Sequence, residues 1–219
     1  MDRRSALVFF SLLVVQSCAK KKHVRSARAP SLPNMPAQIV SPETGLASWY
    51  GHPYHGRAAA NGEIYDMEKL TAAHRTLPFG TWVRVTNLSN SKTVDVRIID
   101  RGPFVDGRIV DLSHAAARAV DLIVAGVGEV RIDVLSLPPA AMSNALFAVQ
   151  VGAFEDKARA ERLRARMQQE YGVAEIALRN GNPPLWRVLA GKERSEATAA
   201  ALAERIRAEL GPAFLVRLD

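Results

Sequence analysis

Residues 97–111 read RIIDRGPFVDGRIVD, a stretch that combines three aspartates with two glycines and one proline. An apolar pair precedes Asp100 and a Gly-Pro turn follows it closely, which places this carboxylate at the end of a strand. Asp106 stands before a glycine, as turn aspartates often do, and Asp111 precedes an apolar helical pattern that it could cap. A carboxylate on a rigid turn at a strand end can face a cleft. Asp100 is therefore the candidate for chemistry, and the alternative is a turn aspartate that binds its own backbone.

Short patterns of alternating apolar and polar residues surround this stretch, broken by glycine and proline. The strands that they predict cover residues 46–50, 81–87, 93–98 and 129–135, and one helix is predicted over 111–124. Several short strands with one or two helices are typical of a small closed β-barrel. We assign this domain to residues 44–136, followed by a proline-containing linker at 137–144.

A different pattern occupies residues 145–219. It predicts strands over 147–151, 173–178, 185–189 and 214–218, and helices over 156–169 and 195–210. The order βαββαβ within about 75 residues is the split βαβ arrangement of an α+β domain. Both helices should cover one face of an antiparallel sheet and leave the other face open.

The N-terminal part of the chain has the features of an export signal. Residues 1–18 combine a basic start with an apolar run, Ala6–Val15, that is too short to span a bilayer. Cys18, the only cysteine, follows directly, so the chain can form no internal disulfide. Residues 19–43 are polar, basic and rich in proline, and predict an extended linker.

The formal net charge of +7 resembles that of a nucleic-acid-binding protein, but its distribution argues against that class. Residues 19–40 contribute five basic side chains and no acidic one. Residues 41–144 carry ten Lys or Arg against eleven Asp or Glu, and residues 145–219 carry twelve against ten. The predicted domains are nearly neutral, and the basic excess lies in a tail that favours anionic membrane surfaces.

The first domain resembles the rare lipoprotein A (RlpA) family, whose core is a double-psi β-barrel. The residues that carry this resemblance are Gly45–Gly51, His55–Arg57, Ala60–Asp66, Thr71–His74, Leu77–Thr81, Asp100–Phe104 and Gly107–Ser113. The resemblance implies a six-stranded barrel and lytic transglycosylation of peptidoglycan, in which the 6-hydroxyl of the muramoyl sugar closes an anhydro ring. One carboxyl group can serve this reaction as acid and then as base.

The resemblance also implies the catalytic residues. It places Asp100 in the role of acid and base and brings Glu63 and His74 into the same cleft. Apart from the resemblance, Tyr50 is a candidate for stacking on sugar rings, because aromatic faces pack well against apolar sugar C–H surfaces. A solvated surface glutamate is the alternative for Glu63, and a structural histidine is the alternative for His74. The histidines of this domain match no helical zinc motif, so we expect no metal and no other cofactor.

The second domain resembles the SPOR family, through Val149–Phe154, Trp186–Val188 and Gly191. SPOR domains bind glycan strands that lack stem peptides, on the open face of the sheet. The resemblance implies Gln150, Trp186 and Arg187 as substrate-binding residues, although alternation puts neighbours on opposite faces and Trp186 could instead belong to the core. The arrangement is also that of RNA-binding sheets, but export and the lack of an aromatic RNP-type run argue against RNA.

The leader resembles a bacterial lipoprotein signal, because Val15–Cys18 is similar to a lipobox. It implies lipidation of Cys18 and a periplasmic protein anchored to the outer membrane; the alternative is a thiol within a cleaved signal. We expect a transglycosylase for stripped glycan at the division septum, with division proteins as further partners. The alternatives are a non-catalytic, glycan-binding scaffold and a hydrolase that needs a second carboxylate.

Overall fold

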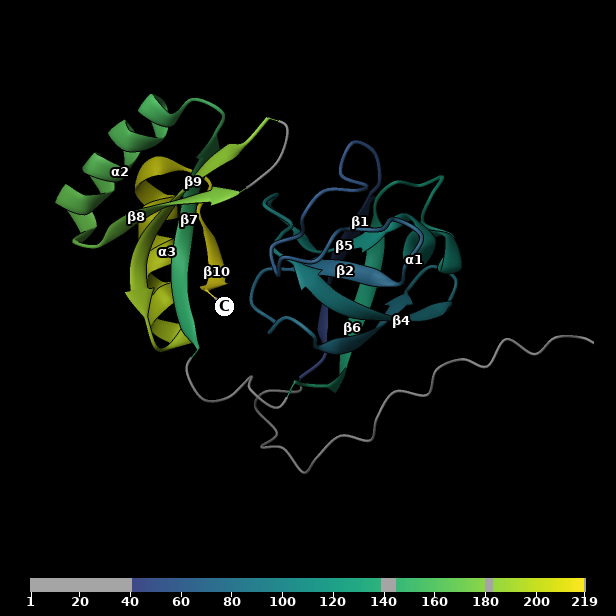
Figure 1. The fold of residues 1–219 in the computed structure, drawn as a ribbon. Coiled ribbons are helices and arrows are strands. Elements are labelled where there is room, and N and C mark those ends of the chain that lie inside the picture. Colours follow the sequence, from purple (N-terminus) through teal and green to yellow (C-terminus); the bar gives the residue numbers. More distant parts are fainter. Residues whose placement is uncertain (1–40, 139–144, 180–182, 219) are drawn as a thin grey trace, which may run out of the picture.

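The computed structural model describes residues 41–138, 145–179 and 183–218, which form two domains joined near residue 140 (Figure 1). The predicted signal, Cys18 and residues 19–40 of the predicted linker lie outside the described residues, whereas Glu43, predicted as the end of the linker, belongs to the first strand. None of the helices in the described part has the length and apolar character needed to cross a membrane.

Six strands close the first domain into a barrel (Figure 1). They are β1 (Glu43–Tyr50), β2 (Thr71–His74), β3 (Trp82–Asn87), β4 (Thr93–Asp100), β5 (Arg108–Ser113) and β6 (Gly128–Ser136), in the spatial order β1-β5-β2-β4-β3-β6. The pairs β1–β5 and β2–β4 are parallel, and the remaining pairs are antiparallel. Alternate residues of β3 and β4, such as Val83, Val96 and Ile98, are fully buried in the barrel core. The predicted six-stranded double-psi β-barrel is confirmed.

Two of these strands were not expected from the periodicity, and the predicted helix over 111–124 is wrong at both ends, because the observed helix covers only His114–Ala119. Residues 111–113 belong to β5, where Leu112 pairs with Trp49 on one side and Ala72 on the other. The helix α1 (His114–Ala119) begins after Ser113, whose hydroxyl accepts the N–H of Ala116. A short apolar run fits both the helical and the strand period, and pairing on both edges decides in favour of the strand.

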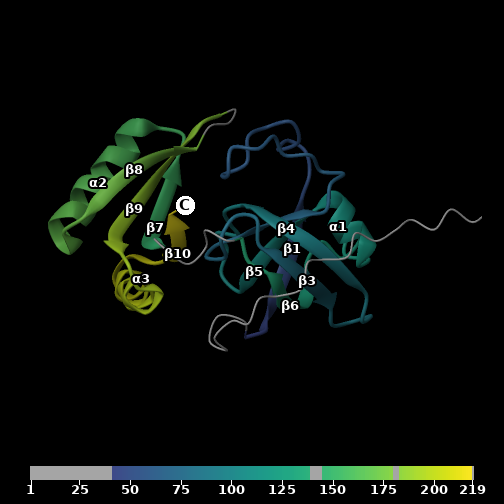
Figure 2. The ribbon, with the colours of Figure 1, turned by 60° about the horizontal axis from the view of Figure 1, so that its bottom comes forward.

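The second domain has the predicted order βαββαβ. Its elements are β7 (Leu146–Phe154), α2 (Lys157–Tyr171), β8 (Ala174–Arg179), β9 (Leu185–Glu193), α3 (Glu196–Leu210) and β10 (Phe214–Leu218). The strands form one antiparallel sheet in the order β10-β7-β9-β8, and both helices lie on one side of it (Figure 2). The predicted α+β domain is confirmed.

The face of this sheet opposite the helices is not open along its whole length. Ala148, Leu189 and Val216 are buried there, and Phe104 of the barrel packs against them. The expectation of an open face therefore needs correction: the turn that follows β4 of the barrel lies against it. The barrel and the sheet meet at the segment that carries Asp100.

Candidate active site

Asp100 is the last residue of β4, and its side chain is only 5% exposed. It lies next to Ala73 of β2 at a register shift between the two parallel strands. Its Oδ1 accepts the backbone N–H of Ala60 (3.0 Å) and of Arg101 (2.8 Å). Its Oδ2 forms an ion pair with Nη2 of Arg179 from the second domain (3.0 Å). The backbone therefore fixes one oxygen, and the other one faces the second domain.

Aromatic side chains surround this carboxylate. It lines a cavity of about 30 Å³ together with Tyr50, Tyr54, Arg57, Ala58, Tyr65, Arg179, Pro183 and Leu185. Tyr50 stacks on Tyr65 with ring centroids 4.3 Å apart, and the hydroxyl of Tyr50 is buried without a hydrogen-bond partner among the described groups. Burial and the negative charge of Asp100 raise the pKa of Tyr50, so its hydroxyl stays protonated and can donate.

The turn after Asp100 is held rigidly from within the barrel. The guanidinium of Arg101 is buried; its Nη1 donates to the carbonyls of His74 (3.2 Å) and Leu77 (2.9 Å), and it lies 3.7 Å above the ring of Phe79. Gly102 has a φ of +145°, a conformation that side chains disfavour. These contacts fix the direction in which the Asp100 side chain points.

Asp111 is a second, half-buried carboxylate near Asp100 and does not cap the helix. It accepts the hydroxyl of Ser48 and lies 3.9 Å from Nε of Arg108. Burial raises the pKa of Asp111; the Ser48 hydrogen bond and Arg108 oppose this shift, and the charge of Asp100 adds to it. The cap falls to Ser113 instead, so the sequence pattern assigned the wrong role to Asp111.

We expect Asp111→Asn to remove a pH-dependent destabilisation. In the unfolded wild type, Asp111 ionises near pH 3.8, whereas in the folded protein it ionises at a higher pH. The contribution of Asp111 to stability therefore falls as the pH rises from 3.8 through the raised pKa of the folded protein. The difference in unfolding free energy between variant and wild type should grow over this window by about 1.4 kcal/mol per pKa unit. Urea unfolding from pH 3.5 to 7 measures it, and a constant difference would contradict the half-buried, ionisable role of Asp111.

Glu63 lies on the surface rather than against Asp100. Its two oxygens accept Nη1 and Nη2 of Arg97 at 2.7 and 2.6 Å, and Asn61 donates to it at 2.9 Å. The Arg97 hydrogen bonds lower the pKa of Glu63, against a small opposing effect of desolvation. The loop of residues 58–64 nevertheless contacts the end of β4, because the backbone N–H of Asn61 donates to the carbonyl of Ile99. Glu63 thus lies on an exposed loop whose residues Ala60 and Asn61 contact the end of β4.

His74 is buried and fully engaged in holding a turn. Its Nδ1 accepts the N–H groups of Thr76 (3.2 Å) and Leu77 (3.1 Å), so Nε2 carries the proton and lies 3.1 Å from a carboxylate oxygen of Glu43. Burial raises the pKa of Glu43, but the hydrogen bond from His74 and the charge of Arg75 outweigh burial and hold this pKa below its usual value. Within the described part of the chain, no hydrogen bond or ion pair joins Glu63, His74 and Asp100. Asp100 lines one cavity, His74 lines others together with Glu43, and Glu63 lines none of these, so the structure does not bring the three predicted catalytic residues together in the cavity at Asp100.

The three predicted binding residues of the second domain do not share one face. Gln150 and Arg187 are joined by a hydrogen bond from Nε of Arg187 (2.6 Å) and lie on the face toward the barrel, where Gln150 is 4% exposed. Trp186 packs with the helix-side core, below Nζ of Lys157. The alternation of the strand thus separates Trp186 from the other two.

Arg179 is the site residue that sequence analysis missed. It stands at the end of β8 and is separated from Asp100 by 79 positions in the chain. Neither the alternation of apolar and polar residues around Arg179 nor its neighbours in the sequence indicate a contact with a catalytic residue. Arg57 and Tyr65 also line the cavity, and both stand within the motifs that resemble the RlpA family, which is the signal that could have found them.

Two family models match the two domains. Residues 42–132 match the model described as lytic transglycolase, and residues 143–217 match the SPOR domain model. The endolytic peptidoglycan transglycosylase RlpA of Vibrio cholerae is 50% identical over 116 residues, which cover 50% of this chain and 44% of that protein. The protein of the same name from Campylobacter jejuni is 40% identical over 157 residues, 60% of this chain and 57% of that protein. The chain spans about half the length of these curated relatives.

A solved structure of an expansin from Clavibacter michiganensis is 22% identical and covers 51% of this chain and 58% of its own, with a TM-score of 0.35. A score of that size carries no argument about function. The family models and the barrel topology agree with the resemblance predicted from the sequence, which is confirmed. The chain therefore carries a double-psi β-barrel domain that matches the lytic transglycolase model, followed by a domain that matches the SPOR model.

Proposed function

We propose that this protein is an endolytic peptidoglycan transglycosylase that cuts the bond between N-acetylmuramic acid and N-acetylglucosamine, with Asp100 as its acid and base. The observation that carries the proposal is the placement of Asp100. Its carboxylate is almost fully buried at a strand end, and two backbone N–H groups orient it. The cavity that it faces is lined by tyrosines. The similarity of the barrel to proteins named endolytic peptidoglycan transglycosylase supports the same activity.

In the proposed reaction Asp100 acts twice. Its protonated Oδ2 first gives a proton to the glycosidic oxygen, and the bond from that oxygen to C1 of the muramoyl sugar breaks with the electron pair going to the oxygen. The carboxylate that remains then takes the proton of the 6-hydroxyl, while O6 forms a bond to C1. The products are a free N-acetylglucosamine hydroxyl and a 1,6-anhydro-muramoyl end, and no water is consumed.

The surrounding residues have supporting roles in this proposal. The Tyr50 hydroxyl, protonated and without a partner among the described groups, can donate to a sugar oxygen beside Asp100. Glu63, on the exposed loop of residues 58–64, can bind sugar hydroxyls, and His74 holds the turn to which Arg101 is anchored. Glu63 therefore binds substrate, and His74 positions the catalytic turn.

The SPOR domain supplies the second part of the proposal. Gln150 and Arg187 would bind glycan strands without stem peptides, and a lipid on Cys18 would hold the protein at the outer membrane. Two attachments raise the local concentration of the barrel at its substrate, so the barrel need not bind tightly by itself. We infer from this combination a periplasmic enzyme that acts on stripped glycan at the division septum.

Product analysis tests the proposal. Denuded glycan, prepared from sacculi with an amidase, is incubated with the purified full chain, and the fragments are analysed by mass spectrometry. Fragments that end in 1,6-anhydro-muramic acid, which is lighter by one water than a reducing end, are expected. Reducing ends alone would establish a hydrolase, and uncut strands that still pellet with the protein would favour the glycan-binding scaffold.

A further inference from the structure

The same contacts that surround Asp100 also connect the two domains. We propose that the sheet face of the SPOR domain opposite its helices is a docking surface for the catalytic turn of the barrel, and that in this closed arrangement each domain covers the glycan site of the other. Glycan must then displace this contact before it can be bound and cut. The inference rests on the proposed function for the identity of the ligand, and on the domain contact for its mechanism.

On the barrel side, the closed arrangement blocks the acid. Nη2 of Arg179 lies 3.0 Å from Oδ2 of Asp100, the oxygen that the backbone leaves free, where the proton and the glycosidic oxygen would have to lie. The cavity that remains, about 30 Å³, holds about two water molecules. Pockets that bind ligands of drug size are larger by at least about tenfold. No sugar fits at Asp100 in this arrangement.

On the sheet side, the barrel covers the residues expected to bind glycan. The ring of Phe104 lies 6.0 Å from that of Phe214 and 5.6 Å from the guanidinium of Arg187. Gln150, hydrogen-bonded to Arg187, is 4% exposed. A glycan strand that reaches Gln150 and Arg187 on this face has to displace Phe104.

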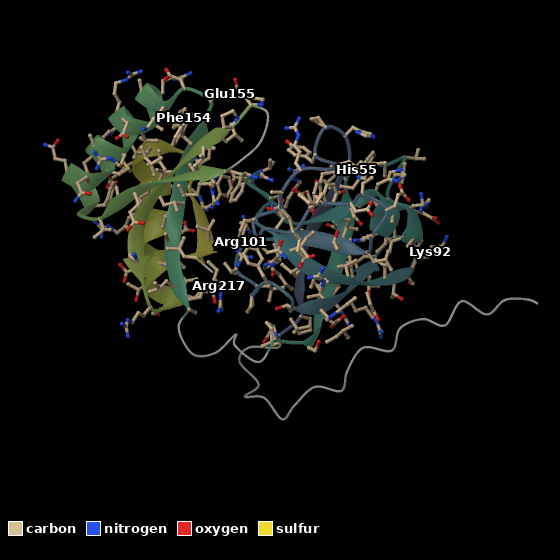
Figure 3. The ribbon with its side chains drawn as sticks, viewed as in Figure 1. His55, Lys92, Arg101, Phe154, Glu155 and Arg217 are labelled. Atoms are coloured by element: carbon tan, nitrogen blue, oxygen red, sulfur yellow. The ribbon has the colours of Figure 1, made fainter. Side chains whose placement is uncertain are left out.

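Hydrogen bonds at the backbone of β10 join the edge of the sheet to the barrel. The N–H of Arg217 in β10 donates to the carbonyl of Arg75 (3.0 Å), and Nε of Arg101 donates to the carbonyl of Arg217 (3.1 Å). Figure 3 shows Arg101 and Arg217 at the boundary between the two domains. The residue next to Asp100 is thus tied to the last strand of the SPOR domain.

The composition of this contact suits a reversible switch. It includes an ion pair, a backbone hydrogen bond, a hydrogen bond from a side chain to a backbone carbonyl, an aromatic pair and a cation–π contact. Interfaces between domains of one chain resemble transient protein interfaces. A ligand that binds only the open arrangement shifts the population toward it by its differential affinity. Stripped glycan fits this requirement, because both sites that it would occupy are covered when the domains are docked.

Arg179→Ala in the purified full chain tests the switch, with Arg166→Ala as the matched control. Arg166 is an ion-paired arginine of the same domain, 54% exposed and paired with Glu170 on α2. Three quantities are measured: hydrogen exchange of the Arg217 amide without glycan, pelleting with denuded sacculi, and the initial rate of anhydro-product formation. A charged hydrogen bond is worth about tenfold or more in an equilibrium. All three should rise by about that factor in Arg179→Ala and stay at the wild-type value in Arg166→Ala.

Phe104→Ala, on the barrel side, should reproduce the rise in hydrogen exchange at the Arg217 amide and in pelleting. If Arg179→Ala does not fold, Phe104→Ala alone tests the domain contact. Wild-type exchange and pelleting in both interface variants would overturn the inference. So would a loss of turnover in Arg179→Ala with unchanged exchange, because Arg179 would then bind substrate. Faster exchange and stronger pelleting, with no anhydro product from any variant, would support the domain contact and refute the proposed transglycosylase.

Discussion

Asp100→Asn is expected to lower the initial rate of anhydro-product formation by about 10²- to 10⁴-fold, the usual contribution of general acid–base catalysis. The amide has nearly the same shape, and its oxygen can still accept the N–H groups of Ala60 and Arg101. It carries no proton that it can give to the glycosidic oxygen and cannot take one from the 6-hydroxyl. The measurement is the rate at which anhydro-muramoyl ends appear from denuded glycan.

Asp106→Asn is the matched control, because Asp106 is an exposed turn residue on the same segment and precedes Gly107, which has a φ of +77°. It should retain the wild-type rate. If Asp100→Asn keeps more than a tenth of that rate while folding normally, Asp100 is not the acid, and the half-buried Asp111 becomes the next carboxylate to test. Exchange at the Arg217 amide should also rise in Asp100→Asn, because Arg179 loses its charged partner.

Much of the fold was predictable because the barrel and the sheet follow simple periods. The alternation in β3, β4 and β6 puts every second side chain in the core, and α2 and α3 bury one stripe each. The sequence did not predict β2 or β5. Both are short and buried on both sides of the pleat, so their apolar runs lack the alternation that identifies a half-exposed strand.

The position of Asp100 was predictable from local chemistry, since an apolar strand that runs into a Gly-Pro turn leaves its last side chain at an edge. Its partner Arg179 was not, because the ion pair depends on how two domains meet, and no local pattern encodes that. His74 and Glu63 were assigned from resemblance alone. In the structure, His74 contacts two N–H donors and a carboxylate, and Glu63 binds Arg97 with both oxygens. These contacts join residues whose pairing the sequence pattern does not reveal.

Arg187→Ala is expected to weaken pelleting with denuded sacculi by about 10- to 100-fold, the usual range for a charged hydrogen bond. Burial first, and the charge of Arg179 second, lower the pKa of Arg187 to about 10, so it remains a cation at neutral pH. Removal of a stem peptide by an amidase leaves a carboxylate on each muramic acid, and a cation on the sheet face is suited to bind it. Without Arg187, Gln150 also loses the donor that fixes its side chain.

This variant separates the two roles that the sheet face combines. Arg187 also contacts Phe104, so its removal should loosen the domain contact and speed exchange at the Arg217 amide, as Arg179→Ala does. Binding should move the other way, because Arg187 would touch glycan and Arg179 would only hold the domains together. Faster exchange with weaker pelleting in Arg187→Ala, against faster exchange with stronger pelleting in Arg179→Ala, is the expected pair of results. If Arg187→Ala binds as well as the wild type, Arg187 serves only the domain contact, and the glycan-binding residues must lie elsewhere on the sheet.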